Sequence, residues 1–278
     1  MAKPTRSSSF VGECGVRIHW QCWLPEATPR AVVVIAHGVS EHADRYSHVA
    51  ARLVGEGYGV YALDHRGHGR SGGRRALIDR LERAVADLDT LIRLTRAEQP
   101  NRKLFLLGHS MGGGLSLEYA LEHSDRIDGL ILSAPSAALE SASTFELVAG
   151  RVLSAVAPGV GVFPVDSSTI SRDPAVVRAY DEDSMVFHEK LPARTVAELA
   201  AAIQTFPERT PGLRVPLLVM LGTADALVPP DAGRMVHERA GSPDKRLIEY
   251  EGLYHEILNE PEQDRVMDDL VEWLDARL

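Results

Sequence analysis

Residues 108–112 read Gly-His-Ser-Met-Gly and follow directly after the apolar run 103–107. A serine in this setting, where a strand turns into a helix, is typical of a nucleophile elbow, which exposes the serine hydroxyl above the edge of a sheet. The two glycines let neighbouring backbone approach where a Cβ would clash. The helix expected over 111–123 directs its positive end at the turn and stabilises negative charge that develops there. Ser110 is therefore our candidate nucleophile.

A serine hydroxyl is a weak nucleophile at neutral pH, so it needs a base and a group that orients the base. Asp225 follows the apolar run 215–221, and His255 follows the run 245–250. Ligands of open parallel sheets bind beyond the carboxyl ends of the strands, and the chain order Ser, Asp, His is the one expected of this architecture. We expect His255 to take the proton of Ser110 and Asp225 to hold the imidazole tautomer.

Other interpretations of these two residues remain open. Asp225 comes shortly after a glycine and could be a turn residue, and His255 could be an ordinary loop histidine. The competing pair is weaker, because His237 lies inside the helical pattern 230–240 and Asp231 suits the start of that helix.

An oxyanion hole needs two backbone N–H groups that point at the reacting oxygen. The elbow supplies the N–H of Met111, the residue after the nucleophile. The second is expected from the loop after the apolar run 31–36, where Val39 is our candidate. His37, in the same loop, is interpreted as a structural turn residue.

The segment 64–71 also follows an apolar run and contains Asp64, His65 and His68. An aspartate and two histidines could begin a metal site. No further acidic or cysteine cluster completes a set of ligands, and the glycines of the segment suit a structured turn. We therefore expect no bound metal here.

Apolar runs that alternate with helical patterns predict how these residues are positioned. The runs are continuous and β-branched, as expected for strands covered on both faces: 31–36, 58–63, 103–107, 127–132, 215–221 and 245–250. Helical spacing occurs at 49–56, 78–98, 111–123, 230–240 and 261–278. The alternation predicts an α/β fold with a mostly parallel sheet and helices on both faces, and residues 10–14 and 17–23 resemble an antiparallel hairpin at one edge.

The alternation stops between residues 136 and 209. This stretch has no convincing strand and has helical patches at 143–156, 174–180 and 195–206. We predict that residues 1–135 and 210–278 form the core and that residues 136–209 form an inserted helical cap.

The cap sequence is largely apolar, and Arg151 is the only charged residue from 147 to 165. Most of these side chains are expected to pack the cap onto the core. A wider apolar stripe could contact a lipid surface, so peripheral membrane contact through the cap is a further expectation. The apolar residues are Phe145, Leu147, Val148, Val152, Leu153 and Val156.

Composition and charge exclude several classes of protein. The net charge of −9, without a long basic block, argues against a nucleic-acid partner. The chain has only two cysteines, Cys14 and Cys22, which we interpret as free thiols. The polar N-terminus has no signal-peptide pattern, and prolines and glycines break the segment 147–165 too often for a membrane helix. These features predict a cytoplasmic or membrane-associated protein.

Taken together, these motifs resemble the α/β-hydrolase superfamily and, within it, the monoacylglycerol lipases of bacterial, particularly mycobacterial, type. The resemblance extends over nearly the whole chain from about residue 16. The elbow alone is generic. The Gly-x-x-Glu-His motif in residues 37–42 and the cap segment 165–173 are more specific to this family. The matching segments are 37–42 with Arg45-Tyr46, 64–71, 108–113, 165–173, 222–225 and 252–255.

The resemblance implies hydrolysis of a monoacylglycerol to glycerol and a free fatty acid through an acyl-enzyme, without a cofactor. It implies a triad of Ser110, Asp225 and His255 with Val39 and Met111 as oxyanion donors. By position, the residues near the glycerol end of the pocket are Glu41, Arg45 and Tyr180. Some relatives have a second histidine three places past the one that matches His255. This chain has Leu258 there, so we expect its glycerol contacts to differ from theirs.

Two alternative functions remain. A broader carboxylesterase or thioesterase would have a similar acyl pocket but accept another leaving group. A non-catalytic receptor for an apolar ligand would be expected to lack part of the triad, which is complete here. An aspartate at the elbow would indicate a dehalogenase, and Ser110 excludes that class.

Overall fold

The computed structural model describes residues 3–138 and 152–278. Its centre is an eight-stranded sheet in the order β1-β2-β4-β3-β5-β6-β9-β10. β2 pairs antiparallel with β1 and with β4, and the other neighbouring strands are parallel. The strands are β1 (Arg6–Val11), β2 (Arg17–Trp23), β3 (Val32–Ala36), β4 (Gly59–Leu63), β5 (Leu104–His109), β6 (Gly129–Ser133), β9 (Leu217–Gly222) and β10 (Lys245–Tyr250).

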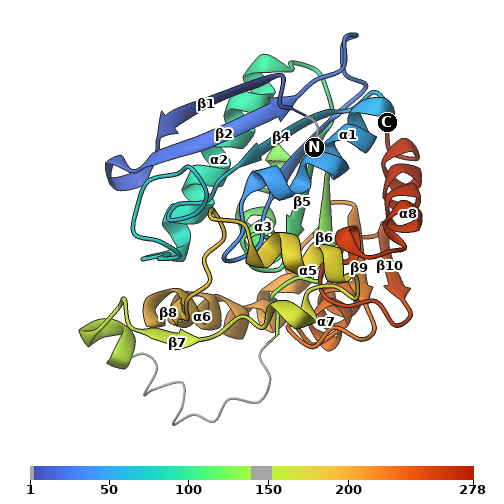
Figure 1. Cartoon of the computed structure of the whole chain (residues 1–278). Helices are drawn as coiled ribbons and strands as arrows, with labels where there is room; N and C mark the ends of the chain where they lie inside the picture. Colours follow the sequence, from blue (N-terminus) through green and yellow to red (C-terminus); the bar gives the residue numbers. More distant parts are fainter. Residues whose placement is uncertain (1–2, 139–151) are drawn as a thin grey trace.

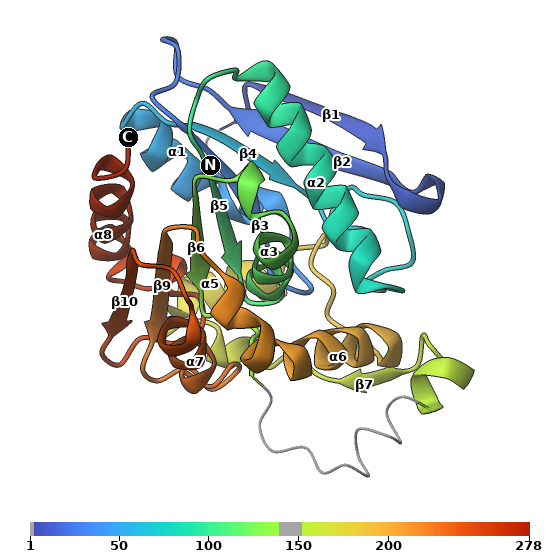
Figure 2. The same ribbon diagram turned by 180° about the vertical axis from the view of Figure 1, so that it is seen from behind.

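The two faces of the sheet carry separate halves of the hydrophobic core. Along β3, Val32 and Val34 belong to one half, and Val33 and Ile35 to the other, because successive side chains of a strand point to opposite faces. Helices α2, α3 and α7 cover the first face, and α1 and α8 cover the second (Figures 1 and 2). Their bounds are α1 (Ser47–Gly55), α2 (Leu81–Glu98), α3 (Met111–Glu122), α7 (Asp231–Arg239) and α8 (Gln263–Asp275). The predicted mostly parallel sheet with helices on both faces is confirmed.

The hairpin at the edge of the sheet differs in one detail from the prediction. Its first strand is β1, which ends at Val11, and residues Glu13–Gly15 form a short 3-10 turn. Cys14 lies in this turn with φ 58°, not in a strand. In the described part of the chain Cys14 is exposed and Cys22 is buried, and both are free thiols, as expected.

The described residues between β6 and β9, 134–138 and 152–216, lie mostly beyond the carboxyl ends of the central strands (Figures 1 and 2). The patches expected at 174–180 and 195–206 are confirmed as α5 (Pro174–Asp181) and α6 (Ala193–Arg209). The patch expected at 143–156 is helical at 152–156, while 143–151 falls outside the described residues. The division of the chain at 135/136 and 209/210 stays a prediction.

The expectation that this segment lacks strands was wrong. β7 (Gly161–Phe163) pairs antiparallel with β8 (Leu191–Pro192) in a small separate sheet. Strands of three and two residues are too short to show the alternation by which strands are recognised in a sequence. Folding brings them together, and the N–H of Ala193 donates to the carbonyl of Val160 at 2.8 Å beside the pair.

Candidate active site

Ser110 lies in the turn between β5 and α3, with backbone angles φ 52° and ψ −119°. This conformation is strained for a residue other than glycine and persists only where the surrounding structure holds it. A Cβ on Gly108 would overlap the carbonyl of Gly112 and the hydroxyl of Ser116. A Cβ on Gly112 would overlap the carbonyl of Ala36 at the end of β3. Both positions require glycine because the elbow packs directly on its neighbours.

Asp225 and His255 follow β9 and β10 and form a buried pair. The Nδ1 of His255 lies 2.7 Å from the Oδ2 of Asp225. The other carboxylate oxygen, Oδ1, accepts the backbone N–H groups of Leu227 at 2.8 Å and Val228 at 2.9 Å. An ionised carboxylate can only accept hydrogen bonds. The Nδ1 of His255 therefore carries the proton, and its Nε2 is left as a base.

The environment of His255 favours a base that takes up a proton readily. Burial acts to lower the pKa of His255, but the adjacent Asp225 carboxylate outweighs burial, and the pKa is raised. Glu256 and Glu41 act in the same direction. The ring of His109 has its centroid 4.7 Å from that of His255, and burial followed by repulsion from His255 lowers the pKa of His109 to about 3. His109 is therefore neutral at physiological pH, and His255 is the histidine that titrates.

Ser110 and His255 both line one cavity of about 420 Å³, which described residues between β6 and β9 line as well. Glu41, Glu256 and Tyr180 line it together with Ser110 and His255. The polar side chains of this cavity lie together, because Glu41 and Glu256 share Arg45, which also lies over the Tyr180 ring, and we call this region the polar end. Most of the remaining lining of the cavity is apolar and includes Phe163, Val165, Leu191, Val196, Leu199 and Ile203. An apolar chamber with a few polar groups at one end suits a ligand with a chain and a small polar head.

Both expected oxyanion donors also lie at this cavity. Val39 and Met111 line it, and within the described residues neither backbone N–H donates a hydrogen bond. A Cβ on Gly38, the residue before Val39, would come 3.3 Å from the Cβ of Ser110, so the loop after β3 approaches the elbow closely. The arrangement leaves two N–H groups available to a substrate oxygen.

A buried ion-pair network forms the polar end of the cavity. The Nη1 of Arg45 lies 2.8 Å from the Oε2 of Glu41 and 2.6 Å from the Oε1 of Glu256, and its Nη2 lies 2.7 Å from the Oε2 of Glu256. The Oε1 of Glu41 accepts the N–H of Gly38 at 2.5 Å and the hydroxyl of Tyr46 at 2.7 Å. Glu41 thus ties the loop that carries Val39 to the rest of the network.

The structure places the remaining expected residues as follows. Glu41 and Tyr180 line the cavity, whereas Arg45 lies behind them with its guanidinium 4.8 Å from the centre of the Tyr180 ring. Leu258 belongs to the hydrophobic core beneath α1 and α8. Glu256 is not among the residues predicted from the sequence. Its position directly after His255 was the only available signal, since its partner Arg45 is 211 residues away in the chain.

The segment 64–71 is a structured turn. Asp64 accepts the backbone N–H groups of Ala43 at 2.9 Å and Arg70 at 2.7 Å. The Nε2 of His37 accepts the N–H of His65 at 2.9 Å, which joins this turn to the loop after β3. Across residues 3–138 and 152–278, no three His, Cys, Asp or Glu side chains are grouped so as to hold a metal ion.

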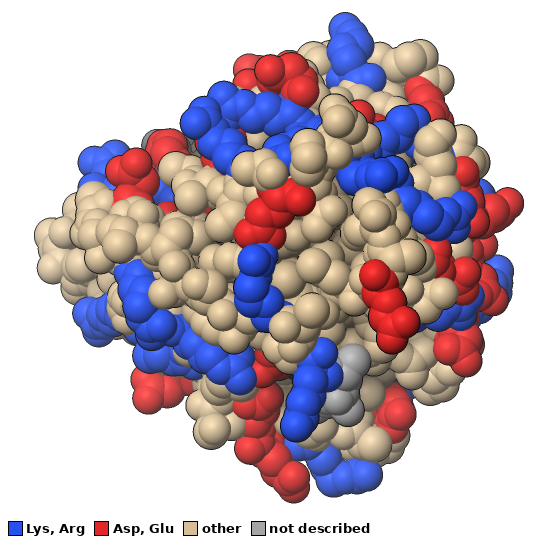
Figure 3. Space-filling model, turned by 90° about the horizontal axis from the view of Figure 1, so that it is seen from above, with Lys and Arg blue, Asp and Glu red and all other residues tan. Residues whose placement is uncertain are grey.

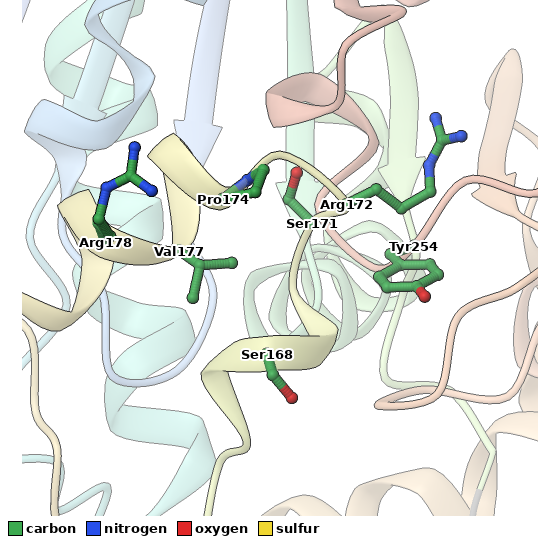
Figure 4. Close-up of a pocket in the computed structure, with 7 residues that line it drawn as sticks. All are labelled: Ser168, Ser171, Arg172, Pro174, Val177, Arg178 and Tyr254. Carbon is green, nitrogen blue, oxygen red and sulfur yellow. The ribbon is translucent and has the colours of Figure 1, made fainter.

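A second hollow of about 410 Å³ lies on the surface near the start of α5 (Figure 4). Arg178 and Arg172 lie on opposite sides of it, with Val177 and Ser171 between them and Tyr254 beside Arg172. Arg172 is also engaged, because it forms ion pairs with Glu260 and Glu262. The hollow lacks the converging polar groups of the first cavity, and we assign no site to it.

Comparison with known proteins agrees with this geometry. Residues 27–262 match the Hydrolase_4 family model, described as serine aminopeptidase, S33. The chain is 44% identical to a monoacylglycerol lipase of Mycolicibacterium smegmatis over the full length of both proteins. It is 35% identical to the human monoglyceride lipase, over 90% of this chain and 84% of that one. The crystal structure of the Paleococcus ferrophilus monoacylglycerol lipase superimposes with a TM-score of 0.84 at 30% identity, covering 94% of this chain and 99% of that one.

These matches and the elbow at the centre of the sheet lead to one assignment. The eight-stranded sheet with α1 and α8 on one face and α2, α3 and α7 on the other is the α/β-hydrolase fold. The family model spans most of the chain, and the identity to the mycobacterial relative is well above the level at which only a fold is shared. The chain belongs to the monoacylglycerol lipase family of the α/β-hydrolase superfamily.

Proposed function

We propose that the protein is a serine hydrolase that cleaves monoacylglycerols to glycerol and free fatty acid. The observation that supports this most directly is the cavity that Ser110 and His255 line together with an apolar set of side chains and with the polar end formed by Glu41 and Glu256. The chamber suits one acyl chain, and the polar end suits a small head with free hydroxyl groups. Described residues of the proposed cap, among them Phe163, Leu191 and Leu199, line the chamber.

In the acylation step, the Oγ of Ser110 attacks the ester carbonyl carbon while the Nε2 of His255 takes the hydroxyl proton. Asp225 stabilises the resulting imidazolium through its 2.7 Å contact with Nδ1. The former carbonyl oxygen, now negatively charged, accepts hydrogen bonds from the backbone N–H groups of Val39 and Met111. The bond to the glycerol oxygen then breaks, His255 returns the proton to that oxygen, and an acyl ester on Ser110 remains.

In the deacylation step, a water molecule attacks the acyl carbon and His255 takes one of its protons. The same two N–H groups stabilise the second tetrahedral intermediate. The bond to Ser110 breaks, His255 returns the proton to the serine oxygen, and the fatty acid leaves. The products are one alcohol and one acid for each ester and water consumed, and no redox partner is needed.

The kinetic test compares esters of one acyl chain in one detergent. We expect kcat/KM to be highest for the monoacylglycerol, lower for the diacylglycerol and lowest for the triacylglycerol, because further chains meet the roof of the chamber. An aryl ester, an acyl thioester and an aminoacyl amide test the neighbouring activities. Triacylglycerol turnover equal to that of the monoester would contradict the proposal, and a faster thioester would favour a thioesterase.

We also propose that the surface beside β7 contacts a lipid surface. Val152 and Val156 are 58% and 76% exposed, and Phe163 is 49% exposed. Phe163 lines the cavity as well, so this apolar surface is continuous with the chamber that would receive the acyl chain. β7 lies at one extremity of the molecule, beyond α6 (Figures 1 and 2). No helix of the described residues is both long and apolar enough to cross a membrane.

Apolar burial rather than charge would drive this contact. The net charge is −9. Figure 3 views the molecule from above and not from the side of β7, and on that upper face basic side chains are interspersed with acidic ones. Exposed apolar side chains gain free energy on entering the boundary of a bilayer without spanning it. A lipid-facing entrance would let a monoacylglycerol pass directly from a membrane into the chamber.

Two valines of equal exposure provide a matched test. Val156 and Val11 are both 76% exposed, but Val11 ends β1 at the far edge of the sheet. Val156→Asp is expected to lower the fraction that sediments with neutral phosphatidylcholine vesicles by about tenfold, and Val11→Asp to leave it unchanged. Equal sedimentation of the two variants would contradict membrane contact through this surface.

A further inference from the structure

The polar end of the cavity contains two carboxylates for one guanidinium. Arg45 forms ion pairs with both Glu41 and Glu256, and all three side chains are at most 10% exposed. One positive charge therefore faces two carboxylates. Burial outweighs the Arg45 guanidinium and raises the pKa of Glu41, so the full excess of negative charge develops as the pH rises through that pKa. Asp225 adds a further carboxylate behind His255. Because charges interact strongly in a buried site, this end of the cavity favours some leaving groups over others.

We propose that Glu256, acting with Glu41, makes the polar end a hydroxyl-accepting subsite that selects a neutral polyol leaving group and rejects an anionic one. The inference deepens the proposed function, on which it rests, and adds a specificity-determining residue to it. The ligand class is a small alcohol with free hydroxyl groups. A leaving group with a phosphate on the same glycerol is excluded.

The hydrogen bonds of the network leave carboxylate oxygens that can accept a further hydrogen bond. They leave no cationic group free to donate one. The Oε1 of Glu256 and the Oε2 of Glu41 each accept one hydrogen bond, in both cases from the Nη1 of Arg45. A carboxylate oxygen has room for a second donor, which a ligand hydroxyl can supply. Both terminal nitrogens of Arg45 are bound to carboxylates, so Arg45 is already neutralised and does not offer an anion a free partner.

The position of Glu256 joins this subsite to the reacting groups. It follows His255 directly, both side chains line the cavity, and its backbone N–H donates to the carbonyl of Ile170 at 2.8 Å. The Arg45 guanidinium lowers the pKa of the Glu256 carboxyl against the effect of burial, which keeps Glu256 ionised. An alcohol whose ester oxygen is within reach of His255 would thus place its free hydroxyls beside an ionised carboxylate.

The charge also predicts a penalty for phosphate. A phosphate about 5 to 6 Å from one uncompensated carboxylate in a surrounding of intermediate polarity loses on the order of 100-fold in affinity. We therefore expect the wild type to hydrolyse a monoacylglycerol at least about 100-fold faster in kcat/KM than the acylglycerol phosphate with the same chain.

The test uses the full-length protein, Glu256→Gln, and three substrates of one chain length: the monoacylglycerol, the methyl ester and the acylglycerol phosphate. Glutamine keeps the shape of the side chain and removes its charge. We expect the ratio of kcat/KM for the monoacylglycerol to that for the methyl ester to fall about tenfold, and the penalty for the phosphate to fall by a similar factor. Because ratios are compared, a partly inactive preparation does not change the result.

Glu251→Gln is the matched control, since Glu251 is an exposed glutamate in the same loop after β10. It should leave both ratios at their wild-type values. A parallel loss on all three substrates in Glu256→Gln would overturn the inference, because it indicates a structural role. A wild type that cleaves the phosphate ester as fast as the neutral one would also overturn it. A wild type that prefers the methyl ester to the monoacylglycerol would instead contradict the proposed function itself.

Discussion

Replacing Asp225 by asparagine removes one charge and changes almost nothing in shape. The carboxylate has two distinct tasks in the structure. Its Oδ2 accepts from the Nδ1 of His255 at 2.7 Å, and its Oδ1 accepts two backbone N–H groups, those of Leu227 and Val228. An asparagine side chain has only one acceptor oxygen, so it cannot do both.

The backbone decides which way the asparagine turns. If its NH2 group faced Leu227 and Val228, three donors would meet without an acceptor. The amide oxygen therefore stays with the two backbone N–H groups, and the NH2 group faces His255. The Nδ1 of His255 must then accept, its proton moves to Nε2, and Nε2, the proposed base, can no longer take a proton.

The expected loss in kcat is on the order of 10³- to 10⁴-fold, as for triads in which the acid is replaced. A 10⁴-fold loss corresponds to about 5.5 kcal/mol of transition-state stabilisation. The assay is hydrolysis of a monoacylglycerol under saturating conditions. The pKa of His255 should fall as well, since burial then acts without the carboxylate, so the acid limb of the residual activity should move to lower pH.

Asp231→Asn is the control for this prediction. Asp231 begins α7, its side chain is 83% exposed, and its ion pair with Arg234 is on the surface. Surface pairs of this kind contribute little to stability, so the variant should keep wild-type activity. Equal losses in the two variants, or near-normal activity of Asp225→Asn, would refute the assignment of Asp225 as the acid.

Three further outcomes are expected. Ser110→Ala should lower kcat by about 10⁴- to 10⁶-fold with an unchanged Tm, and a serine-directed phosphonate should label only Ser110 in the wild type; substantial turnover by a clean preparation would exclude Ser110 as nucleophile. The kcat/KM of the wild type should fall tenfold per pH unit below the raised pKa of His255, because the protonated imidazole cannot accept the serine proton; a flat profile down to pH 4 would contradict this. Asp87→Ala should destabilise the fold by about 3 kcal/mol in urea unfolding, since Asp87 and Arg66 are 1% and 3% exposed and 2.8 Å apart; a loss below about 1 kcal/mol would mean that the buried Arg66 finds another partner.

Much of the candidate site could be predicted from the sequence because its signals are local. The elbow is written in consecutive residues, since the strand, the two glycines and the helix start must adjoin Ser110 for the turn to form. Asp225 and His255 were recognised by their positions after apolar runs, because parallel strands bring their carboxyl ends to one edge of a sheet. The order of strands and helices followed from the same alternation.

The polar end of the cavity could not be predicted in this way. The chain has 30 basic and 39 acidic side chains, and their sequence positions do not reveal which few are buried together. Arg45 meets Glu256 only because the loop after β3 and the loop after β10 lie at the same edge of the folded sheet. The neutral state of His109 beside a titrating His255 depends likewise on burial.

The sequence by itself determined the fold class and predicted the candidate nucleophile and its two candidate partners, because these depend on backbone geometry and on the periodicity of apolar residues. Tertiary structure alone decided the pairing of β7 with β8 and the sharing of Arg45 by Glu41 and Glu256. Both depend on distances between segments far apart in the chain. Such distances follow from the packing of the whole core, which short sequence patterns do not record.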